Sequence, residues 1–332
     1  MARTVLFHEL GGPEVMGLED VAVRAPGPGE VLIRVDAIGL NRAEALFRSG
    51  HYIEQVKQFP ARLGSEAAGV VEAVGEGVTG LRPGQPVSTM PGFSQNDYGV
   101  YAERAIVPAT AVLHRPEGLG AVEGAAVWMP YVTAYGAVVE VGGARPGDTV
   151  VLNAASSSVG LAAIRVADRV GATAIALTRT AAKRDALLKA GAAEVIVTES
   201  QDVVGRVLEL TGGRGAELVL DAVAGPGVTD LARVVAAEGT LLVYGALSGE
   251  PTPYPGIDLG MPALNMRTYT ILETTGRPDR LRRAEAFVAS GLSSGAFWPV
   301  VDRTYELEQV VEAHRYMESN AQVGKIVVTV SH

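Results

Sequence analysis

The feature that most constrains the fold is a regular alternation of apolar strands and amphipathic helices between residues 149 and 273. The predicted strands cover residues 149–153, 174–178, 194–197, 216–221, 240–245 and 267–273. The intervening helices start near residue 159 and cover residues 183–190, 202–210 and 228–236. These strands are almost wholly apolar, which is typical of a parallel sheet with helices on both faces. Strand–helix–strand repetition implies right-handed crossovers, so the region predicts a doubly wound α/β sheet.

The first third of the chain has a different pattern. Short alternating segments such as Glu30–Leu40 and Ala67–Val78 are separated by turns rich in glycine and proline. This pattern favours a β-barrel or sandwich. After the α/β region we expect helices near 279–290 and 305–319 and a final strand over 325–330. A length of 332 residues suits two such domains.

Composition excludes several kinds of protein. The sequence has no cysteine, so it has no disulfides, no thiolate nucleophile and no cysteine-bound zinc. The net charge of −9 and the lack of a basic tract argue against a nucleic-acid partner. No segment resembles a signal peptide or approaches the roughly 18 apolar residues of a membrane span. We therefore expect a cytoplasmic protein without a membrane partner.

The turn after the first strand of the α/β region reads "LNAASSSVGL" over residues 152–161. Dinucleotide-binding folds keep G-x-G-x-x-G at this place, where a helix N-terminus holds the diphosphate. Here the three glycine positions carry Ala155, Ser157 and Gly160. Small side chains still allow close approach, and the string alone is also compatible with an ordinary helix N-cap. Its position favours a diphosphate site formed by Ala155, Ser156, Ser157, Ser158, Val159 and Gly160.

The end of the second strand indicates which dinucleotide binds. An NAD site places an acidic residue there to accept the ribose 2′-hydroxyl. Residues 178–184 contain no acid and offer Thr178, Arg179, Thr180, Lys183 and Arg184. Basic side chains suit a 2′-phosphate, so the sequence predicts NADPH as the cofactor. The alternative is that Lys183 and Arg184 are solvated charges on a helix.

Six segments occur in the order and spacing of one known family. They are "GLNRAEALFRSGHY" (39–52), "LGSEAAGVVEAVGEGVTGLRPGQPV" (63–87), "GVYAERAIVP" (99–108), "YVTAYGAV" (131–138), "VLDAVAG" (219–225) and "VGKIVVTV" (323–330). Over almost its full length the chain resembles the medium-chain dehydrogenase/reductase superfamily, in its zinc-free quinone oxidoreductase-like and enoyl reductase-like branch. The resemblance implies an α/β protein with a discontinuous GroES-like β-barrel domain over 1–125 and 275–332. A Rossmann NADPH-binding domain would then cover 126–274.

Departures from the zinc-dependent members of this superfamily are informative. In those members, the resemblance implies, three zinc ligands (Cys, His and Cys) occupy the positions that match Asn41, Ser65 and Met129 of this chain. The five histidines also show no H-x₃₋₅-H pairing. The resemblance therefore implies a site that holds no metal.

Reduction of an activated double bond needs hydrogen-bond donors for the developing charge and a proton source, while the nicotinamide supplies the hydride. The resemblance implies that Tyr52 positions the substrate or delivers a proton, although Ile53 replaces the usual following proline. The alternative for Tyr52 is an ordinary aromatic at the barrel edge. Asn41 is implied to lie near the nicotinamide ribose and the substrate. Further cofactor contacts implied by the family match are Thr133, Tyr244, Gly245, Ala246, Leu247, Asn320 and Lys325.

These observations favour an NADPH-dependent, metal-independent oxidoreductase whose small-molecule substrate is an enone, an enoyl compound or a quinone. The alternatives are a carbonyl/alcohol oxidoreductase and a nucleotide-binding protein with little catalysis. The strand over 267–273 is last in its series, so we expect it at a sheet edge, where unpaired apolar residues promote association. Relatives pair this strand across a two-fold axis, and the resemblance therefore implies a homodimer.

Overall fold

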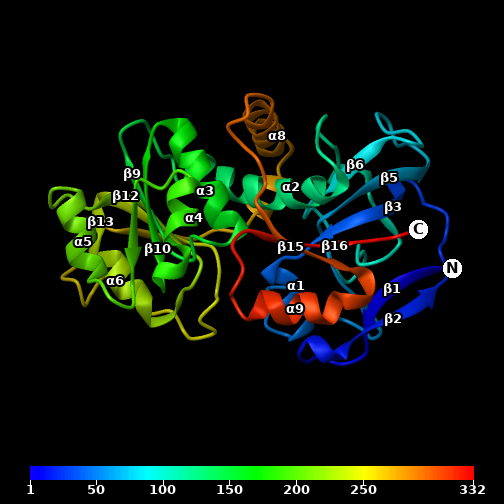
Figure 1. Cartoon of the computed structure of the whole chain (residues 1–332), viewed down its shortest axis with the longest axis horizontal. Helices are drawn as coiled ribbons and strands as arrows, with labels where there is room; N and C mark the ends of the chain where they lie inside the picture. The colour runs from blue at the N-terminus through cyan, green and yellow to red at the C-terminus, as the bar shows by residue number, and fades with distance from the viewer. The chain divides into compact units, whose positions relative to one another are not determined.

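The computed structural model describes all residues 1–332 and contains two compact units (Figure 1). Unit 1 comprises Met1–Met129 and Pro299–His332, and unit 2 comprises Pro130–Trp298. The first boundary lies within four residues of the expected one. The second lies 24 residues later than the predicted boundary after residue 274.

Helix α8 (Pro278–Ser293) explains the later boundary, because its contacts are with unit 2. The guanidinium of Arg283 lies 2.7 Å from a carboxylate oxygen of Glu140. The rings of Phe287 and Tyr135 pack with their centroids 5.1 Å apart. The sequence showed the helix but not the surface on which it packs.

Unit 2 is built on a six-stranded sheet whose neighbouring strands all pair in parallel. The spatial order is β11 (Glu194–Val197), β10 (Thr173–Thr178), β9 (Thr149–Leu152), β12 (Ala216–Asp221), β13 (Val235–Val243) and β14 (Asn265–Thr268). In chain order this is 3-2-1-4-5-6, the doubly wound arrangement with its switch point between β9 and β12. The predicted α/β class is confirmed.

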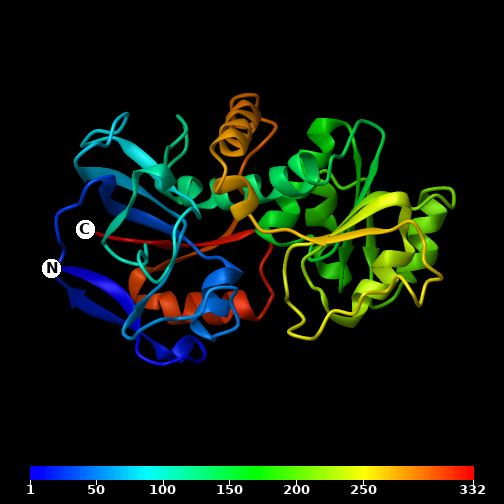
Figure 2. The same cartoon turned by 180° about the vertical axis from the view of Figure 1, so that it is seen from behind.

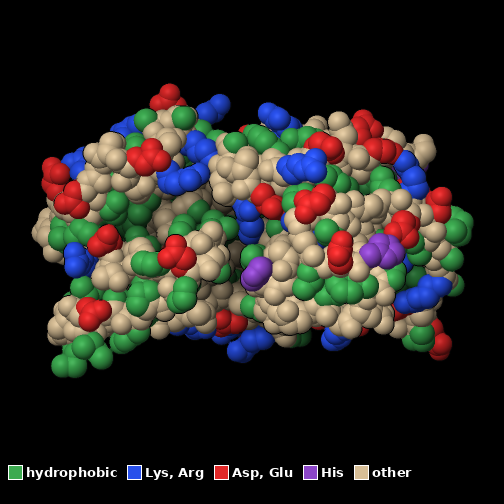
Figure 3. Space-filling view, turned by 90° about the horizontal axis from the view of Figure 1, so that it is seen from below, with side chains coloured by type: hydrophobic (Ala, Val, Ile, Leu, Met, Phe, Trp, Pro, Cys, Tyr) green, Lys and Arg blue, Asp and Glu red, His purple; other side chains and the backbone are tan.

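The predicted helices of this unit occur in the expected order, and two further helices, over 121–135 and 272–275, were not predicted (Figures 1 and 2). Together they are α2 (Ala121–Tyr135, which begins in unit 1), α3 (Ser158–Val170), α4 (Arg184–Lys189), α5 (Val203–Leu210), α6 (Val228–Arg233), α7 (Leu272–Thr275) and α8. The helix predicted over 228–236 was too long, because it ends at Arg233 and Val235 already belongs to β13. No helix combines the length and apolar character needed to cross a bilayer. On the face shown in Figure 3, basic side chains are interspersed with acidic ones.

The last strand of the sheet is shorter than expected. β14 pairs only with β13 and is therefore the edge strand, as predicted, but it ends at Thr268. The prediction that the strand extends to Glu273 was wrong. Tyr269 instead turns its ring inward, where it is 2% exposed and its hydroxyl lies 3.3 Å from Thr274 Oγ1 in α7. Thr270 and Ile271 then lead into α7 and do not continue the strand.

Unit 1 contains a seven-stranded sheet and a three-stranded sheet. Its strands are β1 (Ala2–Phe7), β2 (Met16–Val21), β3 (Glu30–Gly39), β4 (Ala61–Arg62), β5 (Ala67–Val74), β6 (Pro86–Thr89), β7 (Arg104–Pro108), β8 (Val112–His114), β15 (Val301–Glu306) and β16 (Lys325–Thr329). Its helices are α1 (Arg42–Arg48) and α9 (Val310–Glu318), together with the start of α2. The C-terminal strand β16 pairs with β3, with Val328 opposite Ile38, so the chain returns to its first domain as expected.

One segment of this return was predicted wrongly. A helix was expected over 305–319, but Tyr305 belongs to β15, which pairs in parallel with β16. Helix α9 begins only at Val310, after a 3₁₀ turn. The apolar spacing of the segment suits a helix, and the strand forms because a partner strand lies beside it, which local sequence does not show.

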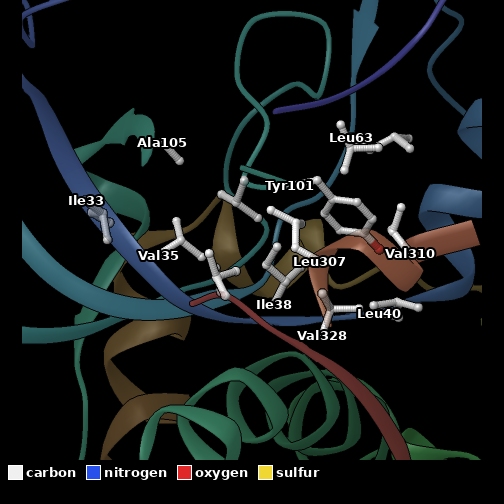
Figure 4. Close-up of a cluster of buried hydrophobic side chains, with 14 of the residues drawn as sticks. Ile33, Val35, Ile38, Leu40, Leu63, Tyr101, Ala105, Leu307, Val310 and Val328 are labelled. Atoms are coloured by element: carbon white, nitrogen blue, oxygen red, sulfur yellow. The ribbon is translucent and has the colours of Figure 1, made fainter. Parts of the chain in front are cut away.

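The core of unit 1 follows the alternation of β3 (Figure 4). Ile33, Val35 and Ile38 are each at most 1% exposed, and they pack with Val328 of β16 and Leu307 before α9. Alternate residues of a strand point to one face, so the period-two pattern of the sequence places Ile33 and Val35 inside. Ile38 has the opposite parity and joins the same core after a register shift between Val35 and Ala37.

A polar network is buried within this core. Arg48 makes two side-chain contacts in this network. Its Nη1 atom lies 2.8 Å from His314 Nδ1, and its Nη2 atom donates to a carboxylate oxygen of Glu318 at 2.7 Å. A guanidinium only donates, so Nδ1 accepts and the imidazole proton sits on Nε2, 3.2 Å from the Tyr101 hydroxyl. Burial, helped by the charge of Arg48, lowers the pKa of His314 to about 3. His314 is therefore a neutral structural residue.

The lowered pKa of His314 predicts a specific pH dependence of stability. Between the pKa values of the unfolded and folded states, the unfolded chain binds the proton, so acid destabilises the fold through this window. We expect His314→Gln, which keeps an acceptor and a donor, to remove about 2 kcal/mol of the loss in unfolding free energy between pH 6.5 and pH 5. Urea unfolding at both pH values measures this. The control is His51→Gln, at an exposed histidine of the same unit; equal slopes for wild type and His314→Gln would contradict the prediction.

Candidate active site

The turn between β9 and α3 has the geometry of an anion-binding helix start. Ser157 caps α3, and its Oγ accepts the backbone N–H of Gly160 at 3.0 Å. A Cβ atom at position 160 would lie 2.5 Å from the carbonyl oxygen of Ala155, so only glycine fits there. The N-terminus of a 13-residue helix carries a partial positive charge and unpaired N–H groups. The turn therefore suits a diphosphate, with Gly160 in the packing role that the sequence suggested.

Lys183 reaches this turn from the loop after β10. Its Nζ lies 3.1 Å from the Oγ of Ser156. Arg179, at the end of β10, is exposed and makes no ion pair. Thr178 is buried and its hydroxyl donates to the carbonyl of Thr180 at 3.3 Å. Lys183 is thus placed at the turn, and Arg179 is an exposed cation that directly follows β10.

Arg184 does not share this arrangement. Its guanidinium lies 3.0 Å from a carboxylate oxygen of Glu194 and donates to the carbonyl of Val195 at 2.8 Å. Both partners belong to the neighbouring strand β11, so Arg184 ties α4 to that strand. The guanidinium of Arg184 is therefore used in a structural contact, which does not support the prediction that Arg184 binds the cofactor. A one-residue step along a helix rotates the side chain by about 100°, which separates it from Lys183.

The ends of β12 and β13 add a buried carboxylate that sequence reasoning did not assign. Asp221 is fully buried, and its Oδ1 accepts from Asn153 at 2.5 Å and from the N–H groups of Val223 and Ala224. The other oxygen, Oδ2, is buried without a hydrogen-bond partner. An acid closing the apolar run "AELVLD" was the available signal.

The loop Tyr244–Leu247 follows β13 and folds against the end of β12. The N–H of Tyr244 donates to Asp221 O at 2.8 Å, and a Cβ at Gly245 would lie 2.4 Å from the carbonyl oxygen of Ala222. Burial, together with the charge of Asp221, raises the pKa of Tyr244. Ala246 and Leu247 are exposed. Thr133 is buried on α2 in the same unit.

Unit 1 contains a second polar cluster, centred on a buried ion pair. Lys325 of β16 and Glu66, before β5, are 1% and 0% exposed, and their charged atoms lie 2.5 Å apart. Lys325 Nζ is also 2.5 Å from Asn41 Oδ1. The second carboxylate oxygen of Glu66 accepts the N–H of Met129 at 2.8 Å. Gly39 makes room for the pair, since a Cβ there would lie 2.8 Å from Lys325 Cε.

Asn41 is held rigidly in this cluster. Lys325 can only donate, so the amide oxygen faces it and the amide cannot flip. The amide nitrogen then lies 3.1 Å from the carbonyl of Gly39 and 3.4 Å from Glu66. Both amide hydrogens therefore have acceptors inside unit 1. Asn320 lies at the end of α9, where its Oδ1 accepts from Arg42 at 2.6 Å.

The donor set at this place does not fit zinc. Ser65 donates its hydroxyl to Glu44 at 3.2 Å, and Met129 contributes its backbone N–H to Glu66. The oxygens of Asn41 and Glu66 already hold the ammonium of Lys325. No three or more His, Cys, Asp or Glu side chains are grouped to bind a metal ion. Zinc sites require thiolates, imidazoles or free carboxylates, and the carboxylate of Glu66 is already paired with the ammonium of Lys325.

Two further groups of unit 1 have shifted pKa values. Burial raises the pKa of Glu44, a fully buried residue of α1, to about 7. Burial, with smaller effects from Glu44 and Glu54, raises the pKa of Tyr52 to about 12. The Tyr52 ring is half-buried and packs edge-to-face on Phe47, with centroids 6.4 Å apart. Tyr52 therefore keeps its proton at neutral pH, and Glu44 was not anticipated from the sequence.

Comparison with known proteins agrees with this two-unit architecture. Residues 27–117 match the alcohol dehydrogenase GroES-like domain, and residues 190–328 match a family described as zinc-binding dehydrogenase. The human quinone oxidoreductase is 30% identical over 331 residues, covering 99% of this chain and 98% of that protein. A 2-haloacrylate reductase from a Burkholderia species is 29% identical, covering 99% of each chain.

Solved structures give the same result. A quinone oxidoreductase of Pseudomonas syringae superposes with a TM-score of 0.92 at 27% identity, covering 99% of this chain and 100% of that one. An Escherichia coli quinone oxidoreductase complexed with NADPH gives a TM-score of 0.91 at 27% identity, covering 98% and 99%. A GroES-like unit joined to a Rossmann-type sheet, together with these quinone oxidoreductase and reductase relatives, supports an NAD(P)H-dependent oxidoreductase. The chain belongs to the medium-chain dehydrogenase/reductase superfamily, in its quinone oxidoreductase-like branch.

Proposed function

We propose that the protein uses NADPH to reduce an activated double bond, in an enone, an enoyl compound or a quinone, without a metal ion. The observation that carries the proposal is the buried Lys325–Glu66 pair with Asn41, at the place where zinc-dependent relatives hold their metal. Without a Lewis acid, direct reduction of a carbonyl needs a side-chain donor that delivers a proton to the oxygen as the hydride arrives. A conjugated acceptor spreads the charge that hydride addition creates, so hydrogen-bond donors are sufficient.

NADPH is favoured over NADH by the charges at the end of β10. A 2′-phosphate needs cations, and Arg179 is an exposed guanidinium there without an ion pair. Lys183 supports the same assignment, because its ammonium contacts Ser156 in the diphosphate turn. No acidic side chain stands in residues 178–184 to accept a ribose hydroxyl. When bound, the nicotinamide supplies the hydride.

The residues of the chain then have defined tasks. The α3 start, with Ser157 and Gly160, binds the diphosphate through its N–H groups. The phenol of Tyr52 keeps its proton at neutral pH and either positions the acceptor or donates a hydrogen bond to its oxygen. Asn41 has both amide hydrogens engaged within unit 1, so we assign it the task of fixing Lys325 and the segment before α1.

We also propose that two copies associate through β14. The strand pairs on one side only, with β13, which leaves its other edge for a second copy. Exposed apolar side chains in the segment before it, Ile257 and Met261, are 77% and 81% exposed and would be covered by association. The proposal rests on this edge and on the pairing expected from the family resemblance.

The proposed reaction predicts a selective pattern of acceptors. We expect NADPH oxidation with 1,4-benzoquinone or an α,β-unsaturated ketone, reduction of the C=C bond of the ketone, and no loss of rate after dialysis against a chelator. Absorbance at 340 nm and product analysis by mass spectrometry measure this. Reduction of a saturated aldehyde, or stoichiometric zinc in active protein, would instead support the carbonyl/alcohol oxidoreductase alternative. Cofactor binding without turnover of any acceptor would support the non-catalytic alternative.

Cofactor selectivity should depend on Arg179. We expect Arg179→Gln to weaken NADPH binding about tenfold or more and to leave NADH binding nearly unchanged, since a charge-assisted hydrogen bond contributes roughly 1.5–3 kcal/mol. Calorimetric titration with both cofactors measures the ratio. The matched control is Arg184→Gln, which should lower stability but preserve the ratio because Arg184 pairs with Glu194. An equal loss for both cofactors would place Arg179 at the diphosphate and contradict the assignment.

Removal of the Tyr52 hydroxyl should separate catalysis from cofactor binding. We expect Tyr52→Phe to lower kcat about 10- to 100-fold, the range typical of a lost donor in the transition state, with little change in the Kd of NADPH. The ring contact with Phe47 is kept, so folding should be preserved. Steady-state kinetics with a quinone, together with NADPH titration, test this. An unchanged kcat would mean that Tyr52 only packs at the edge of unit 1.

A further inference from the structure

Unit 1 contains a polar pocket that shares no residue with the site described above. Its volume is about 220 Å³, and it lies among β1, the end of β2, β4, β7 and the loop before β7. Three arginines line it, Arg24, Arg62 and Arg104, together with Asp97 and Tyr98. A water molecule takes about 30 Å³ in the liquid, so the space suits a small molecule of several water volumes.

Two of the three arginines are neutralised by their own partners. Arg24 makes a bidentate contact with Glu30, with nitrogen–oxygen distances of 2.5 and 2.8 Å. Glu30 also accepts from the Tyr98 hydroxyl at 3.0 Å, and these donors lower the pKa of its carboxyl to about 2. Arg104 lies 2.8 Å from a carboxylate oxygen of Glu72. Arg24 and Arg104 therefore each have a carboxylate partner of their own.

Arg62 is the cation left without a partner. No carboxylate oxygen lies within 4.0 Å of its guanidinium, which also makes no hydrogen bond. Its side chain is half-buried, and a Cβ at Gly99 would lie 2.6 Å from Arg62 Cβ, so the stem is tightly enclosed. Burial, and then the charge of Arg24, lowers the pKa of Arg62. A partly desolvated charge beside a like charge is costly unless an anion meets it.

We propose that this pocket binds a small oxyanion, the carboxylate or phosphate group of a small molecule, with Arg62 as its anchor. A guanidinium presents a planar fork of donors that matches such an anion in a bidentate manner. Asp97 is exposed at the same pocket and carries the opposing charge. The pocket is too small for a dinucleotide, and its residues are separate from the Ser156–Lys183 turn.

The experiment is calorimetric titration of the full chain, saturated with NADPH, with inorganic phosphate and separately with benzoate, at constant ionic strength. We expect saturable binding of at least one anion. Arg62→Gln should weaken it tenfold or more, Arg62→Lys should weaken it less, and Asp97→Asn should strengthen it severalfold. Preference for phosphate or for benzoate identifies which group the pocket takes.

Two controls keep the result specific. Lys183→Gln should leave anion binding unchanged, because Lys183 lies at the cofactor turn. Arg62→Gln should retain NADPH oxidation, which shows that the variant is folded. Absence of saturable binding of both anions by the wild type, or binding that survives Arg62→Gln, would overturn the proposal. Weaker binding by Asp97→Asn would also contradict it, because an anion at Arg62 gains from loss of that carboxylate.

Discussion

The buried ion pair between Lys325 and Glu66 is the interaction on which the candidate site in unit 1 depends. It joins the last strand of the chain to the segment before β5, holds the Asn41 amide, and through Glu66 receives the N–H of Met129 in α2. Removal of one partner from such a pair leaves an unpaired buried charge and costs about 3–5 kcal/mol. The two charges therefore require each other, and a variant that keeps only one of them should be destabilised.

In unit 2 the corresponding constraint is the close approach of α3 to β9. Gly160 allows it, because a side chain there would meet the carbonyl oxygen of Ala155 at 2.5 Å. The approach sets the helix N-terminus and the Ser157 cap at the end of the central strand. Asp221 and the Tyr244–Leu247 loop are then brought to the same end by β12 and β13, since parallel strands end together. One glycine thus gives the diphosphate turn its shape, while the other two positions tolerate alanine and serine.

Most of unit 2 could be predicted from the sequence, because apolar strands and amphipathic helices are local patterns. The exceptions had tertiary causes. β14 ends early because Tyr269 is buried under α7, and β15 forms because β16 lies beside it. The sequence could predict which residue types form the candidate site, but it could not predict which side chains contact one another there. Arg184 looked equivalent to Lys183, and only the packing of α4 on β11 shows that it pairs with Glu194. Glu44, Glu66 and Asp221 were missed because acids inside apolar segments do not reveal their partners.

The sequence by itself determined the family, the order of the strands of unit 2, the lack of zinc-binding cysteines and the absence of an acid at the end of the second Rossmann strand. These follow from residue identity and local spacing. The tertiary structure decided which charges are paired: Lys325 with Glu66, Arg48 with Glu318, Arg24 with Glu30, and Arg62 with none. Arg48 and Glu318 are 270 residues apart in the chain, and only the fold brings such residues within hydrogen-bond distance.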